Sequence, residues 1–255
     1  FRNQAMAFWD KPQYSEAVGW KADPVHTPRL DAFADESVVL SRAMSNCPLS
    51  SPYRGIFLTG MYPERNGITL NCMAERPESS LREDAICISD VLNAQGYSCG
   101  YIGKLHADHP TPNDPANPGH YVSDRRPEWD AYTPAGKRHG YTYWYSYGTF
   151  AEHKNPHYWD TDGIKHEPHV WSVGHETDKA IEFIDANHEQ KPFMLMFHHK
   201  APHRNWMPAP RHLGLFNDTV FPEPETLFDN YEGRGKAARS QDMSIAESLQ
   251  NEWDF

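Results

Sequence analysis

The sequence predicts an α/β fold with a mostly parallel sheet flanked by helices. Segments with a helical pattern alternate with short apolar runs typical of strands, and this alternation favours a parallel sheet. The 255 residues suffice for one large domain or two small ones with a buried core. Because ligands of such sheets bind beyond the carboxyl ends of the strands, polar residues that follow strands are the first candidates for a functional site.

The first predicted elements are a helix, an extended segment and a second helix. Thr27–Glu36 predicts a short helix with an apolar stripe, and Thr27 is expected to cap it. Ser37–Met44 follows as a β-like run. Ser51–Thr59 predicts a helix that has proline in its first turn and ends at Gly60.

Four further elements are predicted in the rest of the chain. Leu81–Gln95 predicts a helix with one apolar side, terminated by a glycine. Tyr97–Gly103 is a short strand candidate. Glu176–Asn187 predicts an amphipathic helix that turns its alanine, isoleucine and phenylalanine side chains inward. Phe193–Phe197 predicts a buried strand.

Two stretches lack this alternation. Residues 107–160 are rich in proline, glycine, histidine and aromatic residues and predict long ordered loops or a small irregular insertion, with a role in substrate binding. Within them, Tyr141–Trp159 fits either packing over the sheet edge or a platform for sugar rings, with His157 and Trp159 as candidate substrate contacts. The end of the chain is polar, with an exposed helix predicted near Ala237–Leu249.

Composition excludes several classes of protein. A formal charge of −11 argues against a nucleic-acid binder, and no apolar run reaches the roughly 20 residues that span a bilayer. The four cysteines form no C-x-x-C motif, and free thiols and disulfides both remain open. The 15 histidines fit either solvated loops or a site for anions, metals or proton transfer.

Three polar clusters fall where ligands of a parallel sheet bind: Ser50–Arg54, Lys104–His106 and His198–Arg204. Ser50 precedes a predicted helix, whose free N–H groups favour an anion. Arg54 lies one turn further along and could reach the same place. A serine at this position also fits the simpler role of a helix cap.

The first cluster resembles the signature of the type I, formylglycine-dependent sulfatases. Ser50-Ser51-Pro52-Tyr53-Arg54 matches its pattern of Cys or Ser, any residue, Pro or Ala, any residue, Arg. The resemblance covers most of the chain and implies the alkaline-phosphatase-like fold, in the N-terminal portion of the catalytic domain of a Ser-type bacterial sulfatase. It extends to the segments Thr27-Pro28-x-Leu30-Asp31, Leu58-Thr59-Gly60, Tyr62-Pro63, Asn66-Gly67, Gly103-Lys104-x-His106 and Lys200-Ala201-Pro202-His203.

This resemblance implies that Ser50 is oxidised to formylglycine (3-oxoalanine) by a radical S-adenosylmethionine maturase. A hydrated aldehyde has one hydroxyl to attack sulfur and a second to expel sulfate, which divides a difficult hydrolysis into two easier steps. Cys47 lies seven residues before Arg54 and does not fit the signature. The other implied roles are as follows: Arg54 holds the diol, Lys104 binds a sulfate oxygen, His106 hydrogen-bonds the diol and removes its second proton, and His203 protonates the leaving alcohol.

The resemblance also implies a divalent cation, usually calcium, with Ser50 among its ligands. The family's acidic metal ligands match nothing here. We therefore expect residues 1–255 to be an incomplete catalytic domain without the first strand and the C-terminal part, and to be poorly active alone. The run Asp160–Gly163 predicts a turn rather than a calcium loop. His198 and His199 remain open between a supporting role and substrate contact.

The predicted function is removal of sulfate from a sulfated carbohydrate. By analogy with glycan-degrading bacterial sulfatases, the protein is expected in the periplasm or secreted, although the chain contains no signal segment. One alternative is a phosphodiesterase or phosphonate hydrolase of the same superfamily. Another is a catalytically inactive glycan-binding relative in which Ser50 stays unmodified.

Overall fold

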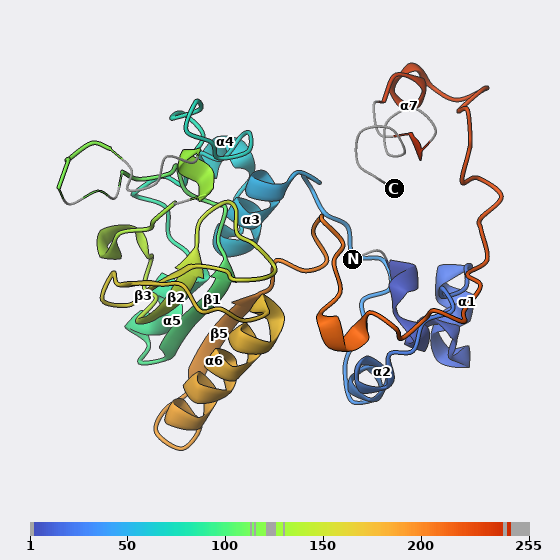
Figure 1. The fold of residues 1–255 in the computed structure, drawn as a ribbon, viewed down its shortest axis with the longest axis horizontal. Helices are drawn as coiled ribbons and strands as arrows, with labels where there is room; N and C mark the ends of the chain where they lie inside the picture. Colours follow the sequence, from blue (N-terminus) through green and yellow to red (C-terminus); the bar gives the residue numbers. More distant parts are fainter. Residues whose placement is uncertain are drawn as a thin grey trace. The chain divides into compact units, whose positions relative to one another are not determined.

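The chain divides into two units in the computed structural model, which describes residues 3–112, 114, 116–120, 126–129, 131–241, 244 and 245 (Figure 1). The first unit runs from Val38 to Ala209 and contains every residue of the three polar clusters. The second combines the described residues up to 37 with those from 210 onward.

A five-stranded mixed sheet forms the centre of the first unit, in the order β4-β3-β2-β1-β5. β1 is parallel to β2 and to β5, with Ile102 opposite Tyr145 and Phe197, whereas β3 and β4 continue the sheet in antiparallel fashion. The α/β prediction is therefore confirmed, and the parallel part is the three strands around β1. The strands are β1 Ser98–Lys104, β2 Tyr143–Tyr147, β3 Tyr158–Asp160, β4 Lys165–His166 and β5 Phe193–His198.

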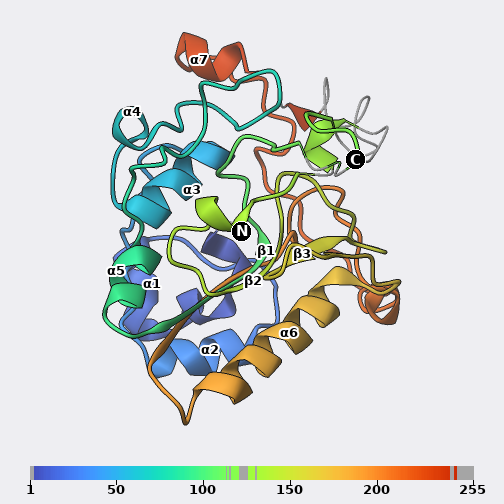
Figure 2. The same cartoon turned by 90° about the vertical axis from the view of Figure 1, so that its left-hand side faces the viewer.

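Helices cover both faces of this sheet (Figures 1 and 2). Successive residues of a strand point to opposite faces. Tyr101 of β1 and Trp144 of β2 accordingly pack in one cluster with Leu58 of α3 and with Cys87, which precedes α5, whereas Ile102 and Tyr145 pack in another with Ala180 of α6. The helices are α3 Ser50–Thr59, α4 Pro63–Asn66, α5 Ile88–Ala94 and α6 Ser172–Asn187, with 3-10 turns at Pro127–Trp129 and Ala135–Lys137.

β1 is buried along its whole length, and two glycines allow its neighbours to come close. A Cβ at Gly100 would lie 2.8 Å from the ring of Phe183 on α6, and a Cβ at Gly103 would lie 2.1 Å from the carbonyl oxygen of His198. Gly103 also has a φ of +90°, which favours glycine. The ends of β1 and β5 therefore meet tightly where Lys104 leaves the sheet.

The long predicted helix over 81–95 is correct only in its second half. α5 begins at Ile88, after a capping box in which the Cys87 N–H donates to the Asp90 carboxylate. The residues before it are held in an irregular path, because the Arg82 N–H donates to the carbonyl oxygen of Asn66. The predicted helix ends of α3 and α5 are confirmed by their following glycines, which have positive φ.

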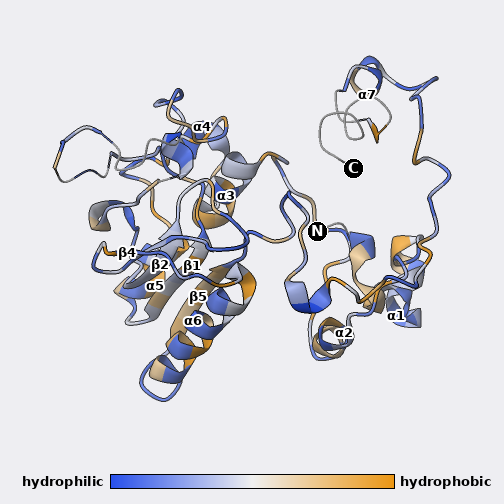
Figure 3. Ribbon diagram, viewed as in Figure 1, coloured by the Kyte–Doolittle hydropathy of each residue, from blue (hydrophilic) through white to orange (hydrophobic). Residues whose placement is uncertain are grey.

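α6 is amphipathic as predicted, but it begins at Ser172, and its buried side differs from the prediction. Ala180 and Phe183 are buried, whereas the Ile181 and Ile184 side chains are 51% and 38% exposed. Glu176 is fully buried on the same side as the sheet-facing residues. Figure 3 shows polar and apolar residues alternating along this helix. The neighbouring strand β5 is confirmed, although it lies at the sheet edge and is half-buried rather than buried.

The strand predicted over Ser37–Met44 is wrong. This segment forms turns and irregular structure, and Val38, Leu40 and Met44 are each at least 74% exposed. A strand is stabilised by pairing with a neighbour, and no described strand pairs with this segment. The apolar composition of the run was therefore not sufficient to define its structure.

The aromatic-rich stretch is largely part of the sheet. β2 and β3 lie within 107–160, so the prediction of irregular loops is wrong for these two segments. Tyr145, Tyr147 and Tyr158 are buried, and the rings of Tyr145 and Tyr158 stack with centroids 4.6 Å apart. Residues 113, 115, 121–125 and 130 of this stretch lie outside the described residues.

The second unit contains short helices and an aromatic cluster. The rings of Phe8, Trp9, Tyr14 and Trp20 lie with neighbouring centroids 4.7 to 6.0 Å apart. Its helices are α1 Pro12–Val18, α2 Pro28–Asp35 and α7 Lys236–Arg239, with 3-10 turns at Asn3–Ala5, Ala7–Asp10 and Pro210–His212.

α2 confirms the predicted N-terminal helix, and Thr27 stands at its N-cap, although the Thr27 side chain makes no capping hydrogen bond. Its hydroxyl accepts a hydrogen bond from the N–H of Ala7 at 2.8 Å and donates to Asp31, rather than capping the helix backbone. α7 confirms only the beginning of the helix predicted over 237–249, of which residues 242, 243 and 246–249 lie outside the described residues.

All four cysteines are free, which decides between the two alternatives left open by the sequence. Cys47 is partly exposed, whereas Cys72, Cys87 and Cys99 are buried. Among the described residues, the helices are all too short or too polar to cross a bilayer, in agreement with the sequence prediction.

Candidate active site

Ser50 and Arg54 open α3 and connect it to the end of β1. Leu49 is extended and stands at the N-cap, so Ser50 is the first helical residue rather than the cap. The Ser50 hydroxyl lies 3.0 Å from Nδ1 of His106. Arg54 Nη1 donates to the carbonyl oxygen of Lys104 at 2.8 Å. Two polar clusters that are far apart in the sequence therefore form one site.

Lys104 is the most strongly perturbed cation of this site. Its side chain is 5% exposed at the end of β1. Burial, followed by the nearby positive charges of Arg54, Lys200 and Arg204, lowers the pKa of Lys104 to about 7. An arriving anion would stabilise the protonated form, so anion binding and protonation of Lys104 are coupled.

His106 is neutral at physiological pH. The residue is 4% exposed, and burial together with the charges of Lys104 and Arg54 lowers the pKa of His106 to about 3. Its backbone has a φ of +47°, and its ring contacts Ser50 at the start of α3. With the proton on Nε2, the neutral ring presents an Nδ1 lone pair to the Ser50 hydroxyl. This geometry suits acceptance of a proton from a hydroxyl at position 50.

His203 approaches Lys104 from a separate hollow. It follows β5, is exposed, and lines a cavity of about 400 Å³ with Lys104, Lys200 and Arg204. Partial burial and then the Lys104 charge lower the pKa of His203. Its carbonyl oxygen lies 3.2 Å from Nε2 of the buried His153, which holds this segment against the loop after β2.

The Ser50 hydroxyl faces a second hollow of about 400 Å³. The structure thus brings Ser50, Arg54, Lys104 and His106 together and places His203 with Lys104 on the basic side. The residues that line the Ser50 hollow are Ser50, Tyr53, Arg54, Phe57, Leu58, Tyr101, His198 and His199.

Two histidines of this hollow are held by partners that sequence reasoning missed. His198 Nδ1 lies 2.9 Å from the Tyr101 hydroxyl, which also bonds to the carbonyl oxygen of Lys104 at 2.8 Å. Burial and the Arg54 charge lower the pKa of His198 to about 4. Tyr101 carried no signal beyond its place in a predicted strand, because its hydroxyl becomes useful only after β5 lies beside β1.

His199 is held by a buried carboxylate. Its Nδ1 lies 2.5 Å from Oε2 of Glu176, and the Tyr158 hydroxyl donates to Oε1 of the same carboxylate at 2.8 Å. Glu176 lies on α6 and is fully buried. Its two partners therefore supply the hydrogen bonds that a buried carboxylate needs. The position of Glu176 near the start of a predicted helix gave no indication of this contact.

The two substrate contacts predicted from the aromatic stretch lie elsewhere. Trp159 is 8% exposed, its ring centroid lies 4.9 Å from that of Tyr132, and Lys165 lies over its face. His157 is half-buried with its ring 6.4 Å from that of Tyr147. Neither lines the hollow beside Ser50 or the one beside Lys104. These contacts support the packing alternative for this stretch.

The donors around Ser50 do not suit calcium on their own. Calcium is bound by six to eight oxygen ligands, whereas Ser50 is surrounded by His106, Arg54 and Lys104. Within the described part of the chain, Cys87, Asp90 and His139 are the one group of three His, Cys, Asp or Glu residues close enough to share a metal. Ser50 is not one of these three residues.

Comparison with known proteins gives consistent matches. The family model described as Sulfatase matches residues 8–247. The chain is 58% identical over 207 residues to an endo-4-O-sulfatase of Bacteroides thetaiotaomicron, covering 80% of this chain and 41% of that protein. It is 37% identical over 235 residues to an N-acetylglucosamine-6-O-sulfatase of the same organism, covering 91% and 36%. The chain thus spans about two-fifths of the length of these curated relatives.

Solved structures agree in fold. One, from work on the metabolism of glycosaminoglycans by Bacteroides thetaiotaomicron, has a TM-score of 0.80 and 54% identity, covering 86% of this chain and 47% of that one. Another, described in complex with its substrate D-glucosamine-2-N,6-O-disulfate, has a TM-score of 0.71 and 33% identity, covering 98% and 43%. The sheet and its flanking helices are therefore those of these neighbours.

Proposed function

We propose, from the premise that this chain belongs to the sulfatase family, that it carries the reacting group of a sulfuric ester hydrolase acting on sulfated carbohydrates. The observation that carries this proposal is the contact between the Ser50 hydroxyl and neutral His106, with Arg54 and Lys104 beside it. The substrate class is supported by the name of one curated relative, an N-acetylglucosamine-6-O-sulfatase, and by the neighbour whose structure is described in complex with D-glucosamine-2-N,6-O-disulfate.

Ser50 is the proposed site of oxidation to formylglycine by a radical S-adenosylmethionine maturase. An aldehyde hydrate at this position would supply one hydroxyl to attack sulfur and another to expel sulfate. The surroundings fit such a group, because the Ser50 side chain points at His106 Nδ1 and faces an open hollow of about 400 Å³. The net reaction converts a sulfate ester and water into an alcohol and sulfate.

The neighbouring side chains provide binding and proton transfer. His106 accepts a proton at Nδ1 from a hydroxyl at position 50. Lys104, charged when an anion arrives, holds a sulfate oxygen, and Arg54 is fixed beside it through the Lys104 carbonyl. His203 reaches the leaving oxygen from the hollow on the other side of Lys104 and protonates it.

Calcium remains part of this proposal through Ser50, but its oxygen ligands are not among the described residues around the site. By likeness to the bacterial relatives, we further propose that the protein acts in the periplasm or after secretion.

Maturation followed by hydrolysis tests the proposal. The protein is coexpressed with a radical S-adenosylmethionine maturase, and the Ser50 peptide is expected to lose the mass of two hydrogens. Hydrolysis of an aryl sulfate should then exceed that of the Ser50→Ala variant and that of an aryl phosphate. An unmodified Ser50, from a host in which a control sulfatase is modified, would contradict the proposal. Faster release of phosphate than of sulfate would favour a phosphodiesterase.

A further inference from the structure

A second group of potential ligand atoms lies at the start of α5, away from the residues used above. Cys87 precedes α5, Asp90 lies in its first turn, and His139 comes from the turn that leads to β2. One ligand atom from each lies within 4.8 Å of the others. Cys87 is 1% exposed, and the side chains of Asp90 and His139 are 33% and 14% exposed.

The spacing of two of these atoms matches ligands of one metal better than direct partners of each other. Nδ1 of His139 lies 3.6 Å from Oδ2 of Asp90, which is too far for a hydrogen bond. A nitrogen and an oxygen bound tetrahedrally to zinc, at about 2.05 and 2.1 Å, lie about 3.4 Å apart. Only a small movement of either side chain would therefore bring these two atoms to the separation of two zinc ligands.

The three side chains are held in place by their backbones. The Cys87 N–H donates to Oδ2 of Asp90 at 2.8 Å, and the Ser89 hydroxyl donates to the carbonyl oxygen of His139. At Gly140 a Cβ would lie 2.7 Å from the Cα of Asp90, so this turn packs directly on α5. The group thus joins two segments separated by about fifty residues of sequence.

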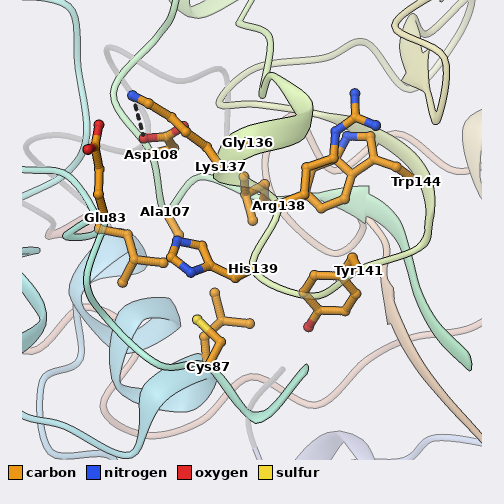
Figure 4. Close-up of a pocket in the computed structure, with 13 residues that line it drawn as sticks. Glu83, Cys87, Ala107, Asp108, Gly136, Lys137, Arg138, His139, Tyr141 and Trp144 are labelled. Carbon is orange, nitrogen blue, oxygen red and sulfur yellow. Dashed lines mark ion pairs between the residues drawn. The ribbon is translucent and has the colours of Figure 1, made fainter. Parts of the chain in front are cut away.

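A small cavity adjoins the group and has room for one further ligand. Cys87 and His139 line a space of about 30 Å³, which suffices for one water molecule. Figure 4 shows the ring of His139 above Cys87 in this pocket, whereas Lys137 turns away to pair with Asp108 at 3.8 Å. The ammonium group of Lys137 is therefore directed away from the three donors.

We propose that Cys87, Asp90 and His139 bind a divalent transition metal of the zinc class, with water from the adjoining cavity as the fourth ligand. A thiol, an imidazole and a carboxylate are the donors that zinc uses in proteins, whereas calcium takes oxygen ligands alone. On binding, the Cys87 thiol loses its proton to the buffer and a metal–sulfur bond forms, with no change of oxidation state. The metal fastens the turn before β2 to α5.

Cobalt provides a spectroscopic test that is independent of sulfate chemistry. The 255-residue chain is freed of metal with a chelator and titrated with Co²⁺. We expect one equivalent to produce the near-ultraviolet charge-transfer absorption of a cobalt thiolate and the visible bands of a tetrahedral site, and Zn²⁺ to displace both. Formylglycine plays no part in this readout. A failure to bind Co²⁺ would therefore leave the proposed sulfatase function untouched, and a failure of that function would leave the metal site untouched.

Matched variants identify the ligands. Cys87→Ser removes the thiol yet leaves a residue that suits the N-cap, so it should fold and lose the charge-transfer band. Cys99→Ser removes another buried thiol and should retain the charge-transfer band. His139→Gln retains the thiol and the cap and should weaken Co²⁺ binding at least about tenfold. Absence of the band in the unaltered chain, or its persistence in Cys87→Ser, would overturn the proposal.

Discussion

Replacing Lys104 with methionine tests how much the burial of an ammonium group lowers the free energy of unfolding. Lys104 is 5% exposed, and burial with neighbouring charges lowers its pKa from 10.5 to about 7. Each pKa unit corresponds to about 1.4 kcal/mol, so the drop of about 3.5 makes charged Lys104 destabilising by about 5 kcal/mol. Methionine keeps the unbranched side chain and removes the charge. We expect Lys104→Met to raise the free energy of unfolding by up to about 5 kcal/mol at pH 6.

The stability gained by Lys104→Met should decrease as the pH rises. A lysine in the unfolded chain keeps its proton up to its ordinary pKa of 10.5, whereas folded Lys104 loses it above about 7. Between these values the unfolded state binds more protons, so the stability of the unaltered protein rises with pH. The advantage of the variant is therefore full below pH 7 and shrinks to about 2 kcal/mol at pH 9.

Urea unfolding at pH 6 and pH 9, followed by tryptophan fluorescence, measures both quantities. Lys191→Met serves as the control, because it makes the same exchange at an exposed lysine of the same unit. The reasoning would be refuted by a Lys104→Met variant no more stable than the parent at pH 6. An equal gain at both pH values would refute it as well.

Three further predictions follow from the same contacts. Sulfate binding, measured by calorimetry, should weaken as pH rises through about 7, because the sulfate contact proposed for Lys104 requires its charged form, and equal affinity at pH 6 and pH 8 would contradict this. Glu176→Gln should lower the free energy of unfolding by about 1–3 kcal/mol, because the buried partners lose their carboxylate, and a change within a few tenths in urea unfolding would contradict it. Gly103→Ala should cost about 3 kcal/mol more than Gly96→Ala in the same assay. Both glycines have positive φ, but only Gly103 would place a Cβ against the β5 backbone, and equal losses would exclude that clash as the cause.

Much of the candidate site could be predicted because local patterns in the sequence determine where its residues lie on a helix or at the end of a strand. Ser50 and Arg54 lie one turn apart on a helix with clear start and end signals, so the sequence predicts their common direction. Lys104 follows an apolar strand, and strand ends of a parallel sheet meet at one edge. The convergence of these residues with His106 therefore followed from helix and strand rules together with a recognisable motif.

The remaining features depend on tertiary packing, which no local pattern encodes. Glu176 becomes a partner of His199 only after α6 lies against the sheet. Trp159 looks like an exposed sugar platform in a run of aromatic residues, but the residue is buried and its ring lies against Tyr132 and Lys165. Val38 is apolar in sequence and yet exposed, because burial depends on what packs against a segment and not on its composition alone.

The unequal burial of the four thiols should allow Cys47, close to Ser50, to be labelled selectively. Cys72, Cys87 and Cys99 are buried, and burial raises the pKa of Cys72 and Cys87 to about 12. Thiolates are the reactive species, so these side chains react slowly with alkylating reagents. Cys47 is partly exposed three residues before Ser50. A maleimide fluorophore should therefore attach at Cys47 in the unmutated protein and report the arrival of ligands beside Ser50 through its emission.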